Sequence, residues 1–337
     1  MTSTQTTSRV LIVDDTPANI QALIAILKQK GYQISVATNG YQALDAVKRV
    51  RPDLILLDVM MPELDGFETC KHLKASAEWH DIPIIFLTAK TETEDIVHGF
   101  ELGAVDYVGK PFNAHELLAR VHTHLAIDRL RRENERLLLN ILPAAIAERL
   151  KSGEEHIADN FAEATVLFAD IVGFTELAGS MRAEQIVELL NDLFTKFDLA
   201  ARDLGIEKIK TIGDAYMAVC GLPDPCANHV EQMITMAIQM MEIARGFSSD
   251  RGINLRLRIG VNTGAVVAGI IGRRKFIYDL WGDTVNLASR MESHGIPDAI
   301  QVTRAVFEKT REQYRFEERG SIEVKGKGAI ETWLLRT

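Results

Sequence analysis

The sequence predicts a doubly wound α/β domain with a five-stranded parallel sheet, then a helical linker, and then an α+β domain. Short apolar strands alternate with helical segments in the first third of the chain, which is the pattern of a parallel sheet. A long helical pattern follows from 113 to about 152, interrupted only at Pro143, and longer strands separated by helices fill the rest. The domain boundaries that we expect are 9–126, 127–157 and 158–337.

The composition is that of an ordinary globular protein of about two domains. The 337 residues are 47% apolar and 25% charged, and their net charge of −9 gives no reason to expect nucleic-acid binding. The polar start MTSTQTTS does not resemble a signal peptide, and no apolar run reaches the ~18–20 residues of a membrane span. We therefore expect a cytoplasmic protein without a membrane span.

The cysteines and histidines give no metal or disulfide pattern. Cys70, Cys220 and Cys226 form no C-x-x-C pair and are odd in number, so we expect buried thiols rather than a disulfide framework or a zinc site. The nine histidines show no metal-ligand spacing.

Polar side chains stand at the ends of the strands expected in the first domain. Asp14 and Asp15 follow VLIV, Asp58 follows LILL, Thr88 follows IIFL, and Lys110 follows DYVG. Because the carboxyl ends of parallel strands converge at the topological switch point, we expect these side chains to meet in one crevice. Three carboxylates repel one another and need a cation, and oxygen ligands favour Mg²⁺. Any one of these acids alone could be a helix cap or a loop residue.

With MPELDG after the third acid and GKPF near the end, residues 9–126 resemble the receiver domain of two-component response regulators. The resemblance implies that Asp58 accepts a phosphoryl group from a histidine kinase or another phosphodonor. It also implies that Asp14 and Asp15, together with Asp58, hold one Mg²⁺.

The same resemblance assigns three further receiver residues. Thr88 would hydrogen-bond the phosphoryl oxygen and Lys110 would pair with it. Tyr107 matches the aromatic switch position of the family, although a half-buried strand tyrosine explains this residue equally well.

The linker carries a heptad pattern. Its seam residues alternate at spacings of four and three and are Thr123, Ile127, Leu130, Asn134, Leu137 and Ile141. An asparagine at an a position of a coiled coil fixes a parallel dimer in register, so we expect a coiled coil and a parallel homodimer. An amphipathic helix packed on its own domain is the alternative.

Two aspartates mark a second candidate site. LFADIVGFT puts Asp170 at a strand end, before a glycine-bearing turn whose backbone amides could hold a phosphate. KTIGDAYMA predicts a hairpin with Asp214 at its tip and Lys210 just before it. Carboxylates on neighbouring strands can hold a pair of cations, although each aspartate alone could be a turn residue.

A third motif, YDLWGDTVNLASRMES, contains Asp279 and then places Asn286 and Arg290 one helical turn apart. By itself, such an Asn/Arg pair more often consists of solvent-exposed surface residues without a functional role. Together with RIGVNTGAVVAGIIG and VKGKG, however, these motifs resemble the catalytic domain of class III nucleotidyl cyclases from about Phe161 onward. NILPAAIAERLKSGE is similar to the segment that this family carries just upstream.

The cyclase resemblance implies a ferredoxin-like α+β fold and two Mg²⁺ or Mn²⁺ ions per site, held by Asp170, Asp214 and the Ile171 carbonyl. Asn286 and Arg290 would act at the ribose and the α-phosphate. The other residues implied in substrate binding are Phe174, Thr175, Arg258 and Lys325. In this family, the metal-binding acids of one catalytic domain face the base-reading and Asn/Arg residues of its partner.

Hydrogen-bond chemistry favours adenine as the base. Adenine presents an acceptor at N1 and a donor at its 6-amino group, whereas guanine presents the reverse. A donor at Lys210 with an acceptor at Asp279 suits adenine, and cyclases specific for GTP resemble the reversed arrangement. The sequence therefore predicts an adenylyl cyclase that converts ATP to 3′,5′-cyclic AMP and pyrophosphate by two-metal phosphoryl transfer and is regulated by receiver phosphorylation.

Two other classes of protein remain as alternatives. A transcriptional response regulator would need a basic recognition helix, which the second domain lacks. A degenerate cyclase that only binds nucleotide is disfavoured because the whole motif set is present.

Overall fold

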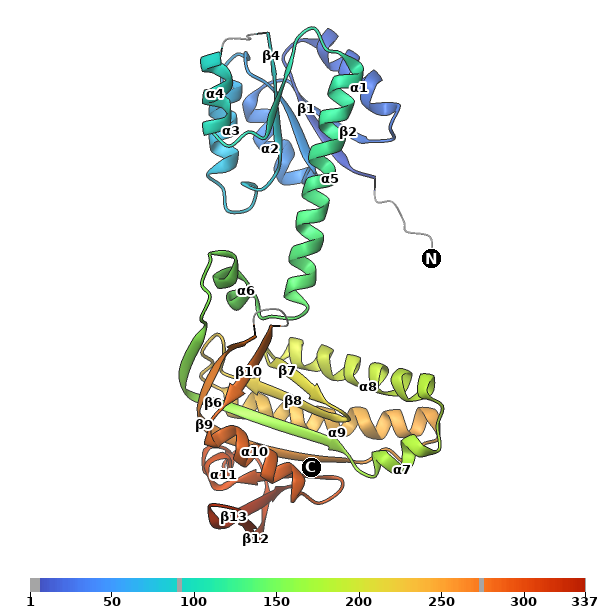
Figure 1. Ribbon diagram of the computed structural model, residues 1–337, viewed down its shortest axis with the longest axis vertical. Coiled ribbons are helices and arrows are strands. Elements are labelled where there is room, and N and C mark those ends of the chain that lie inside the picture. The colour runs from blue at the N-terminus through green and yellow to red at the C-terminus, as the bar shows by residue number, and fades with distance from the viewer. Residues whose placement is uncertain (1–6, 90–92, 273–275, 337) are drawn as a thin grey trace. The chain divides into compact units, whose positions relative to one another are not determined.

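The computed structural model describes residues 7–89, 93–272 and 276–336, which form two compact units, Met1–Leu137 and Leu138–Thr337 (Figure 1). Most of the polar stretch MTSTQTTS lies outside the described residues. Within the described part of the chain, no helix combines the length and the apolar character that a membrane crossing requires.

The first unit is the doubly wound α/β domain that the strand pattern predicts. Its parallel sheet has the order β2-β1-β3-β4-β5. The strands are β1 (Arg9–Val13), β2 (Gln33–Ala37), β3 (Leu54–Asp58), β4 (Ile84–Thr88) and β5 (Asp106–Gly109). The helices are α1 (Pro17–Lys28), α2 (Gly40–Val50), α3 (Gly66–Lys74), α4 (Thr93–Glu101) and α5 (Ala114–Leu139). Helices α1 and α5 pack on one face of the sheet, and α2 and α3 pack on the other (Figure 1).

The loop between β3 and α3 explains the motif MPELDG. A Cβ atom at Gly66 would lie 2.2 Å from the carbonyl oxygen of Asp58, so only glycine lets α3 begin this close to the end of β3. Asp65 caps the helix, because its side chain accepts a hydrogen bond from the Glu68 backbone N–H at 2.9 Å. The motif therefore fixes the start of α3 directly behind the third acid.

Helix α5 is held to the end of the domain opposite the acids by ion pairs around Asp128, which is 5% exposed. The Asp128 carboxylate lies 2.9 Å from Arg131 Nη2 and 2.8 Å from Arg132 Nε. The same two arginines also pair with Asp81 and Asp53, in the loops that precede β4 and β3. A buried carboxylate is stable only when it is paired, so these contacts clamp α5 where it leaves the sheet.

The linker differs from the continuous helix that we expected up to Pro143. Helix α5 ends at Leu139, and α6 (Ala144–Lys151) begins after a turn, so Ile141 lies outside the helical seam. Within α5, Ile127 and Leu130 are 55% and 64% exposed, so these seam residues do not pack on their own domain.

The second unit is the expected α+β domain. Its sheet has the order β12-β13-β11-β9-β6-β8-β7, with β10 added beside β9. The strands are β6 (Ala158–Ile171), β7 (Glu207–Ile212), β8 (Ala215–Cys220), β9 (Leu257–Ile271), β10 (Ile277–Trp281), β11 (Ala299–Thr303), β12 (Phe316–Val324) and β13 (Gly328–Leu335). The helices after α6 are α7 (Phe174–Gly179), α8 (Ala183–Asp203), α9 (His229–Arg251), α10 (Asp283–Ser293) and α11 (Arg304–Thr310).

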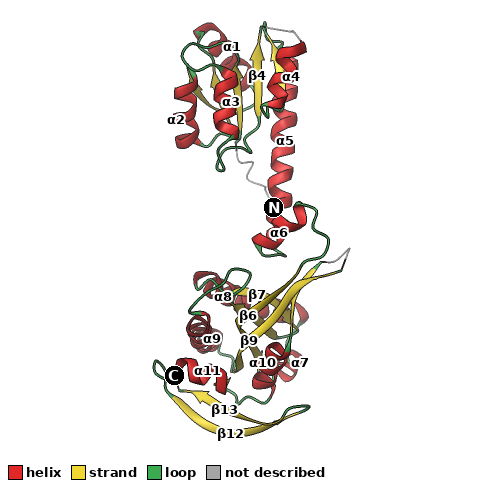
Figure 2. Cartoon of the chain, turned by 90° about the vertical axis from the view of Figure 1, so that its left-hand side faces the viewer, coloured by secondary structure: helices red, strands yellow, loops and turns green. Residues whose placement is uncertain are grey.

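The antiparallel strands β9-β6-β8-β7, together with α8 and α9, form the ferredoxin-like core. Alternate residues of β6 face different layers. Leu167 and Ala169 pack toward α8 and α9, whereas Val166 and Phe168 pack with residues of α6, β10 and α10. Helices α8 and α9 lie on one side of the sheet and α10 lies on the other (Figure 2). Asp170 follows Val166 and Phe168 in the same alternation, so its side chain points to the face of the sheet that α10 covers.

Helix α10 lies unusually close to the sheet. A Cβ atom at Gly260 on β9 would lie 2.0 Å from the backbone nitrogen of Glu292, so glycine is required at this crossing. The close approach brings the end of α10 over the strands that carry the acids of the second unit.

Candidate functional site

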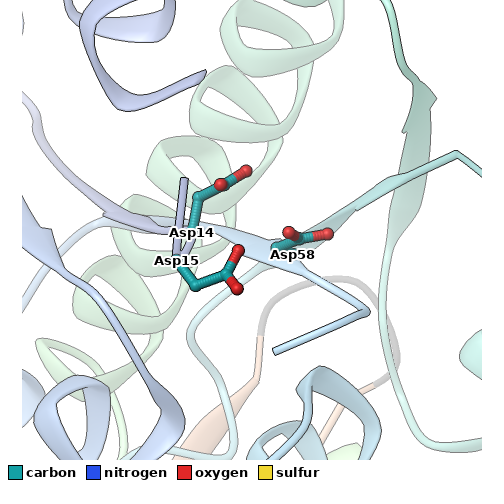
Figure 3. A group of neighbouring side chains, drawn as sticks. All are labelled: Asp14, Asp15 and Asp58. Carbon is teal, nitrogen blue, oxygen red and sulfur yellow. The ribbon is translucent and has the colours of Figure 1, made fainter. Parts of the chain in front are cut away.

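The three acids of the first unit meet as the strand-end pattern predicts. The carboxylate oxygens of Asp14, Asp15 and Asp58 lie within 4.8 Å of one another (Figure 3). Asp14 and Asp58 are 0% and 4% exposed, whereas Asp15 is exposed. Such a cluster of carboxylate oxygens is a ligand set that fits Mg²⁺.

Lys110 neutralises two of these acids. Its Nζ atom lies 2.8 Å from Asp14 Oδ2 and 2.7 Å from Asp58 Oδ2. Burial raises the pKa of Asp58, and the Lys110 ammonium acts in the opposite direction. Burial alone would lower the pKa of Lys110, but its hydrogen bonds to the two carboxylates raise it. Asp14 is further oriented by Asn19, which donates to both of its oxygens at 3.0 and 3.1 Å.

Thr88 and Tyr107 come from the neighbouring strands β4 and β5. Thr88 is 7% exposed at the end of β4, and both side chains line one small apolar cavity next to α4. Tyr107 is half-buried, with its ring 6.2 Å from that of Phe100 and 5.6 Å from the Arg120 guanidinium.

In the second unit, three adjacent strands bring Asp170, Asp214 and Arg258 together. Arg258 on β9 stands opposite Asp170 on β6, and its Nη2 atom donates to Asp170 Oδ2 at 2.8 Å. Asp214 lies at the tip of the β7–β8 hairpin, half-buried beside Asp170. Burial raises the pKa of Asp214, and the charge of Asp170 raises it further. The two carboxylates therefore repel each other, and the charge of Arg258 offsets this repulsion only in part.

Glu292 is a further acid at this site that the sequence did not reveal. It is 8% exposed, and its Oε1 atom lies 3.1 Å from Arg258 Nη2. Burial raises the pKa of Glu292 to about 7, with a contribution from the charge of Asp170. The available signal was its spacing, because Glu292 continues the apolar face of α10 that includes Thr284 and Ala288.

The expected base-reading pair is in contact. Lys210 Nζ lies 2.5 Å from Asp279 Oδ2, and the two side chains are 33% and 18% exposed. Lys210 comes from β7, next to a bulge in its pairing with β8, and Asp279 comes from β10.

Asn286 and Arg290 lie on α10 and line an open groove of about 450 Å³ together with Lys325. Lys325 belongs to the turn between β12 and β13, where Lys327 pairs with Asp283 at the start of α10. All five side chains are exposed. The groove thus combines one amide, three cationic groups and the Asp283 carboxylate, and its volume is typical of a small-molecule site.

The turn after β6 is formed as expected. Ile171 is 2% exposed at the end of β6, and Phe174 opens the short helix α7 and packs against the core. Thr175 is exposed beside it.

Comparisons with known proteins identify both units. Residues 157–337 match the family model described as the adenylate and guanylate cyclase catalytic domain, and residues 10–122 match the response regulator receiver domain. The chain belongs to the adenylate and guanylate cyclase family and carries a receiver domain ahead of its cyclase domain. Cyclases of this class use divalent metal ions.

The similar proteins include cyclases of both kinds. An adenylate cyclase of Mycobacterium tuberculosis is 48% identical over 203 residues, which are 60% of this chain and 46% of that protein. The human guanylate cyclase soluble subunit beta-2 is 39% identical over 222 residues, or 65% of this chain and 36% of that protein. The chain thus spans less than half the length of these curated relatives.

Two solved cyclase structures match the second unit. The catalytic core of a rhodopsin-guanylyl cyclase with converted specificity, in complex with ATPαS, is 33% identical with a TM-score of 0.52, covering 53% of this chain and 98% of that chain. The adenylyl cyclase CyaB from P. aeruginosa is 27% identical with a TM-score of 0.52, covering 54% of this chain and 96% of that chain.

Proposed function

We propose that this protein is an adenylyl cyclase that converts ATP to 3′,5′-cyclic AMP and pyrophosphate and that phosphorylation of its receiver domain regulates the rate. Membership of the cyclase family supports the reaction class. The observation that carries the choice of ATP over GTP is the contact between Lys210 and Asp279.

The proposed base recognition follows from the chemistry of this pair. Lys210 donates to N1 of adenine, and Asp279 accepts from the 6-amino group. Guanine would bring its N1–H against the ammonium and its O6 against the carboxylate. Each buried mismatch costs ~1–3 kcal/mol, so two mismatches disfavour GTP by well over tenfold.

Asp170 and Asp214, with the carbonyl of Ile171, are the residues that would hold divalent cations. These residues fit a divalent cation because the two carboxylates repel each other, as the raised pKa of Asp214 indicates. A cation between them relieves this repulsion. Bound Mg²⁺ or Mn²⁺ supplies positive charge that acidifies the ribose 3′-hydroxyl and neutralises the departing pyrophosphate. Arg258, already paired with Asp170, is then placed to bind the triphosphate.

The groove on α10 supplies the remaining contacts to substrate. Asn286 orients the ribose, and Arg290 stabilises the charge that develops at the α-phosphate. Lys325, from the facing turn, binds the triphosphate. We place the phosphates near the turn formed by Phe174 and Thr175.

We further propose that each active site is shared by the two chains of a homodimer. Glu292 contacts Arg258 beside the metal-binding acids, whereas Arg290 precedes it by two residues and lies about 200° away around the helix. Arg290 therefore projects away from the acids of its own chain. The partner chain's acids would complete the site, which requires a two-fold dimer.

The receiver would act on this dimer through α5. Phosphorylation of Asp58 adds about −1.5 to −2 charge, and Thr88 and Lys110 bind the added phosphoryl group. The Tyr107 side chain then shifts in response. The exposed seam residues of α5, including Leu130, would pair with those of a second chain in a parallel coiled coil. A shift of the paired helices would then move the two cyclase domains relative to each other.

The experiment is product analysis with the full chain and Mg²⁺ or Mn²⁺, offering ATP and GTP separately and together. Formation of cyclic AMP from ATP, with at least about tenfold less cyclic GMP from GTP, is the expected result. Preferential formation of cyclic GMP would overturn the base assignment, and absence of both products would overturn the enzyme assignment.

A further inference from the structure

Two cysteines at the end of β8 share one hydrogen-bond acceptor. The Sγ atoms of Cys220 and Cys226 lie 3.2 Å and 3.1 Å from the same atom, Oε1 of Gln232 on α9. The two thiols are also direct neighbours, because the charge of Cys226 and a hydrogen bond with Cys226 both raise the pKa of Cys220. The sulfurs therefore face each other across a single oxygen, although no C-x-x-C motif links them.

The two thiols differ in their access to solvent. Cys220 is 0% exposed, whereas Cys226 is half-buried in a loop whose neighbouring residues 224, 225, 227 and 228 are exposed. Burial, and then Cys226, raises the pKa of Cys220 to about 12, so Cys220 stays a thiol at neutral pH. An oxidant from solvent therefore reaches Cys226 first.

The surroundings of Cys226 suit both the thiol and the thiolate. Its Sγ atom lies 3.0 Å from Asn228 Oδ1, in addition to its contact with Gln232. Primary amides can present either an oxygen or an NH₂ group by rotating, so the same two side chains can accept from a thiol and donate to a thiolate.

We propose that Cys220 and Cys226 are a peroxide-oxidisable pair that closes to a reversible intrachain disulfide in the folded protein. In the first step, the Cys226 thiolate attacks a hydroperoxide. The O–O bond breaks, the sulfur becomes a sulfenic acid, and the departing hydroxide takes up a proton to form water. In the second step, Cys220 sulfur attacks the sulfenic sulfur and loses its proton, and a second water leaves.

Electrons balance in this sequence, because the two sulfurs together lose two electrons and the peroxide gains two. Formation of the neutral sulfenic acid also removes the negative charge that disfavours a thiolate at Cys220. A dithiol reductant reverses the reaction by thiol–disulfide exchange.

Cys70 provides an internal control within the same chain. It is 0% exposed in the receiver domain, burial raises its pKa to about 11, and its thiol donates to the Leu102 carbonyl at 3.6 Å. A buried thiol of this kind is inert toward oxidants in the folded protein.

The test treats the reduced full-length chain with one equivalent of hydrogen peroxide, blocks remaining thiols under unfolding conditions, and measures intact mass and cross-linked peptides. The expected product has lost two hydrogen atoms, keeps one alkylatable thiol at Cys70, and yields a peptide joining Cys220 to Cys226 that dithiothreitol separates. Cys70→Ser should form the same cross-link.

Two variants report the order of events. Cys226→Ser should lose the reaction, and Cys220→Ser should stop at a sulfenic acid on Cys226 that dimedone captures. Wild-type protein that ends with sulfinic or sulfonic acid at Cys226 and a free Cys220 would overturn the proposal. A disulfide to Cys70 or to another chain, or the absence of any reaction in excess peroxide, would overturn it equally.

Discussion

Arg258 stands directly opposite Asp170 on the neighbouring strand, and its guanidinium donates to the Asp170 carboxylate at 2.8 Å. Asp214 lies beside this pair with a raised pKa caused by burial and by the charge of Asp170. One guanidinium is thus the cationic partner of the acids to which we assign the metal ions.

We expect Asp170→Ala and Asp214→Ala each to lower turnover by at least about 100-fold, because each removes a carboxylate that would hold the cations. Circular dichroism should show that both variants keep the fold, since both side chains are only half-buried. Asp203→Ala, at the exposed end of α8, is the control. Cyclic AMP formation within tenfold of wild type in either variant would refute the metal assignment.

The double variant Lys210→Glu with Asp279→Cys should lose ATP turnover and gain preference for GTP. The substitutions replace the donor by an acceptor and the acceptor by a weak donor, which is the reverse of what adenine needs. The ratio of kcat/KM for ATP to that for GTP is the informative quantity, and it should fall by well over tenfold. If this ratio stays unchanged, the base is recognised by other residues.

The clustering of the receiver-domain site residues could be predicted from the residues that follow each strand. Asp14, Asp58 and Lys110 each follow an apolar strand, and parallel strands bring such residues to one edge. These three residues could be predicted because their positions depend on local periodicity and on a short repeat of elements. The roles of Lys210 and Asp279 were expected from the resemblance to the cyclase family, and strand order alone did not predict their contact.

Glu292 and the clamp at Asp128 could not be predicted in this way. Glu292 belongs to the site only because Gly260 lets α10 approach the sheet closely, and this contact joins residues distant in sequence. Asp128 is buried by loops before β3 and β4, and a charged residue on a helix normally reads as solvent-exposed. Both features depend on tertiary packing. The spacing of Glu292 from Ala288 indicates the buried face of α10 but does not show which residues lie against that face.

Stability should fall with rising pH because of Glu207 on β7. Burial raises its pKa from 4.5 to about 7 in the folded chain. Between these two values the folded state keeps a proton that the unfolded state releases, so stability decreases as pH rises through this window and is constant above it. Glu207→Gln should weaken this slope, to which the raised pKa of Glu292 also contributes, and should raise stability at about pH 8 by roughly 1–3 kcal/mol after allowance for partial solvent screening.

Calorimetry of the full chain at about pH 5 and about pH 8 measures this effect as the change in unfolding temperature between the two conditions. Glu188→Gln, at an exposed position on α8, is the matched control and should behave as wild type. An identical pH dependence in wild type and Glu207→Gln would show that Glu207 does not titrate in the window.

Insertions in α5 should separate the regulation of the cyclase domain by the receiver domain from the catalytic activity itself. One residue inserted after Arg132 turns the downstream helix by about 100°, whereas seven residues preserve the heptad phase. We expect the response of cyclase rate to beryllofluoride to be lost in the first variant and kept in the second. Asp58→Asn should remove the response and serves as the negative control. A wild-type response in both insertion variants would exclude transmission through a coiled coil.

Complementation between two inactive chains tests most directly whether this protein is a cyclase with shared sites. Asp170→Ala lacks a metal-binding acid, and Asn286→Ala lacks the ribose contact, so each homodimer should be inactive. In an equal mixture about half of the dimers contain both chains, and one of their two sites is intact, so cyclic AMP formation should return to about a quarter of wild type. Mixed dimers that demonstrably form and yet make no cyclic AMP would contradict the shared-site cyclase.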